Sequence, residues 1–115
     1  MPQPKRGEVW LVRFPFTNLT STKLRPALIL AVHGEDIIVM GIFSRMPLGE
    51  LHDTWVQIEE HHPMFSQIGL KKASLLKAEK IAVIHESVLR RKLGVLPHDI
   101  MAQVEETLKR ALLLS

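Results

Sequence analysis

Residues 26–43, PALILAVHGEDIIVMGIF, contain two apolar runs separated by four turn-forming residues. The first run, 26–32, is apolar at every position, as expected of a central strand buried on both faces. The intervening HGED is typical of a tight turn, in which Gly34 supplies backbone angles that other residues avoid. The second run, 37–43, then returns beside the first. This stretch therefore predicts an antiparallel hairpin at the centre of a sheet.

The segments around the hairpin favour more short strands. Residues 8–16, EVWLVRFPF, alternate, with Trp10, Val12, Phe14 and Phe16 on one face, so they predict a half-buried strand. Pro15 indicates that its far end lies at a sheet edge or leaves the sheet. The remaining segments predict a loop at 45–53, a fourth strand at 54–58, a loop with a helical turn at 59–72, and short strands near 73–76 and 81–84.

Residues 97–113 give the clearest helical pattern. The apolar stripe comprises Ile100, Val104, Leu108, Ala111 and Leu112. Pro97 suits the first helical position, and Asp99 and the pair Lys109–Arg110 suit the two ends of the helix dipole.

Together these elements predict one domain over residues 1–115, mainly β with a C-terminal helix. Short antiparallel strands tend to curl into a small barrel because closure removes exposed edges. An SH3-like or OB-like small antiparallel barrel is the expected fold.

Composition excludes several classes of protein. The chain has 115 residues, 46% of them hydrophobic, and no cysteine, so it has neither disulfides nor thiolate metal sites. Its apolar runs are too short to cross a bilayer and its first residues do not resemble a signal peptide. We expect a cytoplasmic protein that does not contact membranes.

No motif indicates a metal or a cofactor. The adjacent pair His61–His62 follows Glu59–Glu60, but neighbouring positions point to different sides and no HExxH spacing is present. The chain also lacks the glycine-rich motifs that bind nucleotide phosphates and the GxSxG motif of serine hydrolases. We expect neither a metal site nor a cofactor.

Basic residues are concentrated in two segments, 1–34 and 71–92, and most residues between 35 and 60 that carry charge are acidic. If the two basic segments meet in space, they form a surface suited to a polyanion. Scattered solvated lysines would give the same composition, so both interpretations stay open.

Arg25 is the most informative single residue. It stands at the start of the apolar strand, where a guanidinium needs an anionic or hydrogen-bonding partner. Its fork of donors matches phosphate oxygens, although a structural arginine bonded to loop carbonyls would fit the sequence equally well.

Small polar residues surround Arg25 in the predicted fold. The hairpin should bring Ser44 and Arg45, at the end of the returning strand, close to Arg25. The preceding loop contributes small donors and one cation: Asn18, Thr20, Ser21, Thr22 and Lys23. We predict a substrate-binding rim formed by this loop and Arg45.

The block RGEVWLVRFPFTNLTSTKLRPALIL resembles the opening of the PemK/MazF family of toxin endoribonucleases. Three further blocks continue the resemblance in the family's order: IIVMGIFSR, LKKASLLKAEKIAVI and LRRKLGVL followed by a helix. The resemblance covers nearly the whole chain, and the RPA block after a W-V-F strand is its most specific part.

The resemblance implies an SH3-like barrel, a homodimer and metal-independent, sequence-specific cleavage of single-stranded RNA, including mRNA. The products would be a 2′,3′-cyclic phosphate and a 5′-hydroxyl. A cognate antitoxin of a type II toxin–antitoxin module would thread a segment across the active site. Arg25 matches the family's catalytic arginine, and since an arginine keeps its proton in proteins, stabilisation of charge on the phosphate suits it better than a role as base.

The chain departs from the family at Phe43, which stands where relatives commonly carry threonine. Ser44 follows it and is the candidate for a second catalytic residue, with the loop hydroxyls of Thr20–Thr22 as the alternative source. A one-residue shift reverses the side-chain face of a strand, so a weakened or inactive nuclease is a third possibility.

Three functions are compatible with these features. The first is a ribonuclease toxin that relies on Arg25. The second is a non-enzymatic toxin that resembles the gyrase poison CcdB, and the third is a decayed barrel that binds RNA without cutting it. Exposed apolar residues expected on the third strand and the last helix also favour a homodimer.

Overall fold

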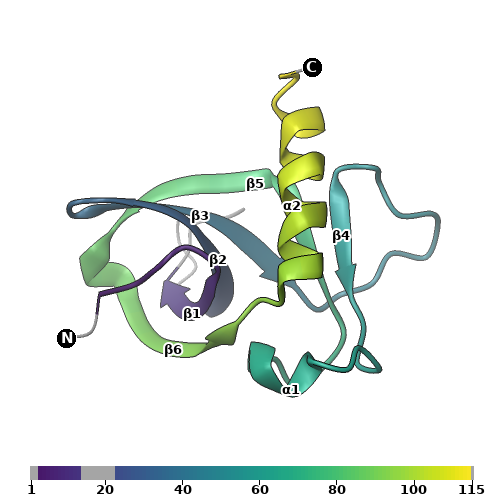
Figure 1. The fold of residues 1–115 in the computed structure, drawn as a ribbon, viewed down its shortest axis with the longest axis horizontal. Helices are drawn as coiled ribbons and strands as arrows, with labels where there is room; N and C mark the ends of the chain where they lie inside the picture. The colour runs from purple at the N-terminus through teal and green to yellow at the C-terminus, as the bar shows by residue number, and fades with distance from the viewer. Residues whose placement is uncertain (1–2, 14–22, 115) are drawn as a thin grey trace.

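The computed structural model describes residues 3–13 and 23–114. Six strands, two α-helices and one short 3₁₀ turn follow one another along these residues (Figure 1). In chain order they are β1 (Glu8–Arg13), β2 (Leu24–His33), β3 (Asp36–Phe43), β4 (Trp55–Ile58), α1 (Phe65–Ile68), β5 (Ser74–His85), the 3₁₀ turn (Glu86–Val88), β6 (Leu89–Val95) and α2 (His98–Ala111).

The strands form one antiparallel sheet in the order β4-β5-β3-β2-β1-β6. The predicted hairpin is at its centre: Val32 pairs with Ile37 across a turn in which Gly34 has φ +63°. The mainly β class with a C-terminal helix is confirmed. The structure does not confirm that the sheet closes into a barrel, because no ladder between described residues joins the edge strands β4 and β6. The sheet curls, and α2 lies beside β4 and β5 (Figure 1).

The strands predicted after residue 72 differ from the structure in two ways. The two short strands expected near 73–76 and 81–84 are one strand, β5. Its pairing with β3 skips from Leu76 to Ile81, so residues 77–80 form an irregularity in the ladder rather than a break between two strands. The sequence analysis also missed β6, because an edge strand rich in arginine and lysine shows no apolar alternation.

The strand at 8–16 was expected to be half-buried, but the described part, β1, is buried on both faces. It pairs with β2 on one side and β6 on the other. Val9 belongs to one apolar cluster, and Trp10 and Val12 belong to a second. Residues 14–16 lie outside the described part of the chain.

The core consists of these two clusters, to which alternate residues of β2 contribute: Leu28 to the first and Ile29 to the second. Helix α2 packs on the first cluster through Ile100 and Val104. The predicted stripe ends early, because Leu112 follows the helix and is 45% exposed, and Pro97 caps α2 rather than beginning it. No helix in the described residues is long and apolar enough to span a membrane.

Candidate active site

A groove of about 450 Å³ opens where β2 begins and β3 ends. One wall is apolar and includes Leu11, Pro26, Ile42 and Leu93. The polar lining consists of Arg25, Ser44, Lys71, Lys72, Ser74 and Arg91. The groove therefore combines four cations and two hydroxyl groups, and no carboxylate of the described residues lines it.

The sheet register explains why Arg25 and Ser44 lie at one place. Arg25 pairs with Val12 of β1, and two residues later Ala27 pairs with Gly41 of β3. Antiparallel pairing therefore sets the first residues of β2 beside the last residues of β3. The predicted proximity of Ser44 to Arg25 is confirmed, because both side chains line the groove.

Of the predicted rim residues, two are described but do not line the groove, and the other four lie outside the described residues. Arg45 and Lys23 are exposed, and neither lines the groove. Asn18, Thr20, Ser21 and Thr22 lie outside the described residues.

Three cations of the groove were not singled out from the sequence. Lys71 and Lys72 precede β5, and Arg91 lies on β6. All three belong to the basic segment 71–92, so charge clustering was the signal that could have found them. The two basic segments do meet, with Arg25 from the first and these residues from the second.

Two glycines bring the Lys71–Lys72 segment against β6. Gly69, which ends α1, has φ +81°, and a Cβ there would collide with the carbonyl of Leu93. A Cβ at Gly94 would collide with the backbone of Gln67 and Ile68. Lys71 and Lys72 on this segment and Arg91 on β6 all line the groove. The Ser74 hydroxyl also holds this segment, because it donates a hydrogen bond to the Lys72 carbonyl at 3.0 Å.

Phe43 does not line the groove, although Ile42 and Ser44 on either side of it do. Its ring instead lies beneath the guanidinium of Arg25, with Cζ 5.6 Å from the ring centroid. The residue that replaces the expected threonine therefore contacts the arginine rather than the groove.

A sequence model of the family described as PemK-like, MazF-like toxin of type II toxin–antitoxin systems matches residues 5–112. The chain belongs to this family. No curated protein matches it in sequence.

Several solved structures share the fold. One is an endoribonuclease in complex with its cognate antitoxin from a mycobacterial species, with a TM-score of 0.72, 22% identity and 98% coverage of both chains. The Mycobacterium tuberculosis toxin MazF-mt6 has a TM-score of 0.72 at 19% identity, covering 94% of this chain and 98% of that one. MazF from Deinococcus radiodurans has a TM-score of 0.68 at 21% identity, covering 95% and 96%.

In this PemK/MazF-family chain, Glu8 supports β6 beside the groove. Its buried carboxylate accepts hydrogen bonds from Trp10 Nε1 and the Lys5 backbone, both at 2.9 Å, and pairs with Lys92 at 3.1 Å. Burial alone would raise the pKa of Glu8, but these partners outweigh burial and hold the pKa below its usual value. The charge of Lys92 is thus paired with a carboxylate, whereas its neighbour Arg91 lines the groove.

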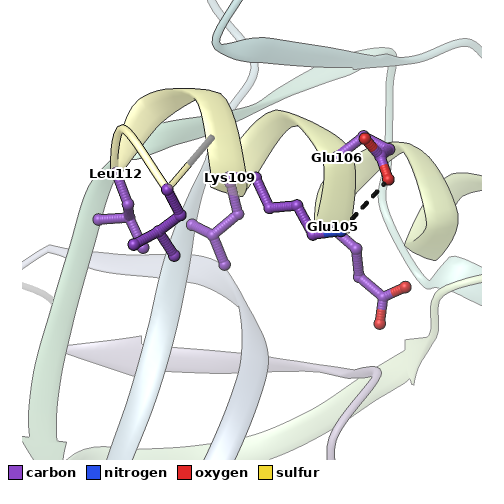
Figure 2. Close-up of a pocket in the computed structure, with 6 residues that line it drawn as sticks. Glu105, Glu106, Lys109 and Leu112 are labelled. Atoms are coloured by element: carbon purple, nitrogen blue, oxygen red, sulfur yellow. Dashed lines mark ion pairs between the residues drawn. The ribbon is translucent and has the colours of Figure 1, made fainter.

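A second hollow, of about 420 Å³, lies along the end of α2. Figure 2 shows Glu105, Glu106, Lys109 and Leu112 at this hollow, with an ion pair of 3.6 Å between Lys109 and Glu106. Acidic groups outnumber the one lysine there, so the hollow does not suit a phosphate chain. The described residues also contain no group of three or more side chains placed to ligate a metal ion.

Proposed function

We propose that this protein is a toxin endoribonuclease that cleaves single-stranded RNA at specific sequences in the cytoplasm. One observation carries the proposal: Arg25 and Ser44 line one groove with three further cations and without a carboxylate among the described residues. Such a lining attracts a phosphate chain. Membership of the toxin family supports the same function.

The proposed reaction uses the RNA's own nucleophile. The 2′-hydroxyl attacks the adjacent phosphorus and releases its proton to solvent. The bond to the 5′-oxygen of the next nucleotide breaks, and that oxygen takes up a proton from solvent, so no net proton, water or co-reactant is consumed. The products are a 2′,3′-cyclic phosphate and a 5′-hydroxyl. Arg25 would stabilise the negative charge that develops on the phosphorane, and Ser44 would donate a hydrogen bond to it.

We propose that this reaction needs no metal ion and no cofactor. The attacking group is internal to the substrate, and the guanidinium of Arg25 supplies the positive charge that a metal would otherwise bring. Lys71, Lys72 and Arg91 would hold the phosphates on either side of the scissile one. The other proposed substrate-binding residues are those of the predicted rim: Asn18, Thr20, Ser21, Thr22, Lys23 and Arg45.

A homodimer and a cognate antitoxin are the proposed protein partners. The apolar surface predicted on the third strand is not available, because Ile37, Val39 and Ile42 of β3 are buried within the chain. The residues that follow α2 do expose apolar side chains, with Leu113 at 89% and Leu114 at 67%. Apolar side chains exposed together favour a protein contact at this end of α2.

The decisive test is cleavage of a long single-stranded RNA by purified protein in excess chelator, with both product ends mapped. We expect discrete cuts that leave the two ends named above. Arg25→Ala should lower the rate at least about 100-fold, the usual loss when one preorganised oxyanion donor is removed. Ser44→Ala should lower it by a smaller factor.

The other functions give different results in the same assay. A gyrase-type toxin would cut no RNA, and its toxicity in cells would survive Arg25→Ala. A decayed binder would retain RNA without cutting it. Cuts that disappear on adding chelator and return with a divalent cation would overturn metal independence while leaving the nuclease assignment intact. Circular dichroism of each variant shows whether it is folded.

A further inference from the structure

Five side chains form a continuous row that begins at Arg25 and leads away from the groove. The Phe43 ring lies between two cations, Arg25 at 5.6 Å from its centroid and Lys77 Nζ at 4.9 Å. The same Lys77 Nζ is 4.4 Å from the centroid of the Trp55 ring. His52 completes the row by stacking on Trp55, with centroids 4.1 Å apart and an interplanar angle of 1°.

The sheet fixes the order of this row. Phe43 pairs with Leu75 of β5, and Trp55 of β4 pairs with Lys77, so the row crosses β2, β3, β5 and β4 in their order in the sheet. The indole of Trp55 is held by its Nε1–H, which donates to Glu79 at 2.7 Å. Glu79 also accepts from the Thr54 hydroxyl at 2.8 Å. The aromatic platform is therefore anchored before any ligand binds.

The cations of the row are not paired with carboxylates of the described residues. Among ion pairs between described residues, none involves Arg25 or Lys77. An aromatic ring attracts a cation but does not neutralise it, so both groups can still bind phosphate. Both cations contact the same phenyl ring, so we assign them to phosphates of the same strand.

The outer end of the row offers a flat ring. His52 is exposed and uses one face on Trp55, so its other face is turned away from the indole. A base can extend such a stack whatever its identity, because every base has a π face. Glu79 lies beside Trp55 and would repel a phosphate there, which places the phosphate contact at Lys77 and the base contact at His52.

We infer that this row, Arg25–Phe43–Lys77–Trp55–His52, is a binding track for the RNA that adjoins the scissile phosphate. Lys77 binds a phosphate, and the His52–Trp55 pair stacks on a base. The inference rests on the proposed function, because the track continues from Arg25, but it concerns binding and can be tested without cleavage.

The test uses a fluorescein-labelled 2′-O-methyl RNA of about 10 nucleotides, which lacks the attacking hydroxyl and cannot be cut. Fluorescence anisotropy measures its affinity at several salt concentrations. Lys77→Met keeps the aliphatic stem and removes the charge, so we expect the slope of log K against log salt to become shallower by about 0.7, the value for one phosphate on a single strand. His52→Ala should weaken binding roughly 5- to 150-fold with little change in slope.

Two variants serve as controls. Lys109→Met on α2 removes the same charge from a lysine that pairs with Glu106 and is not a member of the row, so this variant should bind as wild type does. Trp55→Phe keeps a ring on the platform, so it should retain most of the affinity but lose the fluorescence quenching that a base stacked beside this tryptophan causes. Equal affinity and slope for wild type, Lys77→Met and His52→Ala would overturn the track.

The outcomes separate this inference from the proposed function. A wild-type protein that cuts no RNA but shows the Lys77 and His52 effects refutes the nuclease and supports the track. A protein that cuts RNA, with neither effect in the binding assay, refutes the track and leaves the nuclease standing. Absence of all RNA binding refutes the track directly.

Discussion

The guanidinium of Arg25 lies over the phenyl ring of Phe43, with Cζ 5.6 Å from the ring centroid. The ring stands where the resemblance led us to expect threonine, and in this chain it contacts the guanidinium of the proposed catalytic residue. We expect Phe43→Leu to lower the cleavage rate about 2- to 5-fold, since an exposed cation–π contact contributes about 0.5–1 kcal/mol.

Phe43→Tyr keeps the ring and is the matched control, so its single-turnover rate should stay close to that of the wild type. If the leucine and tyrosine variants cut at the same rate, the ring has no part in placing Arg25.

The neighbours Arg90 and Arg91 on β6 provide a second test. Arg91 lines the groove, whereas Arg90 is exposed and donates to the Ser87 carbonyl at 3.1 Å. Arg91→Ala should weaken binding of an uncleavable single-stranded RNA and make its salt slope shallower by about 0.7, because one phosphate contact is lost. Arg90→Ala removes the same charge and should leave the slope unchanged. Equal slopes for the two variants would place the RNA outside the groove.

Stability should depend on pH through Glu8. Its pKa is lowered in the folded protein, because the hydrogen bonds from Trp10 and Lys5 and the charge of Lys92 outweigh the effect of burial. Its contribution is therefore complete above the pKa of an unfolded glutamate, about 4.3, and is lost as the pH falls through the lower folded value.

Glu8→Gln should cost about 1.5–3 kcal/mol of unfolding free energy at pH 7, the usual value of hydrogen bonds to a charged group. Urea unfolding across pH 2.5–7 measures the difference from wild type, which should shrink towards the acid end. A difference that stays constant with pH would mean that the carboxylate charge does not stabilise the β1–β6 pairing.

The contact of the α1 turn with β6 should tolerate no added side chain. Gly94→Ala would drive a Cβ into the backbone of Gln67 and Ile68, and overpacking of this kind costs about 1–3 kcal/mol or more. Gly49→Ala is the control, because nothing lies within 4 Å of a Cβ at that position, and it should change stability by less than about 0.5 kcal/mol. Thermal unfolding compares the two, and a wild-type melting temperature for Gly94→Ala would contradict this contact.

Much of the candidate site could be predicted from local sequence. The apolar runs on either side of Gly34 specify the central hairpin, and an antiparallel hairpin must bring Ser44 back beside Arg25. The end charges of α2 and its buried residues Ile100 and Val104 also follow from a 3.6-residue period. These features depend on residues close together in the chain, so pattern and turn chemistry suffice.

The rest depends on contacts between distant segments. In the sequence, Lys71, Lys72 and Arg91 are marked only by their charge. They meet in the groove because Gly69 and Gly94 let the end of α1 pack closely against β6. The row from Arg25 to His52 likewise requires four strands in register, because its members are far apart in sequence. The sequence by itself determined the hairpin, the helix and the position of the arginine. Only the tertiary structure decided which cations and rings surround it, because a sheet joins strands through non-local hydrogen bonds that no local pattern encodes.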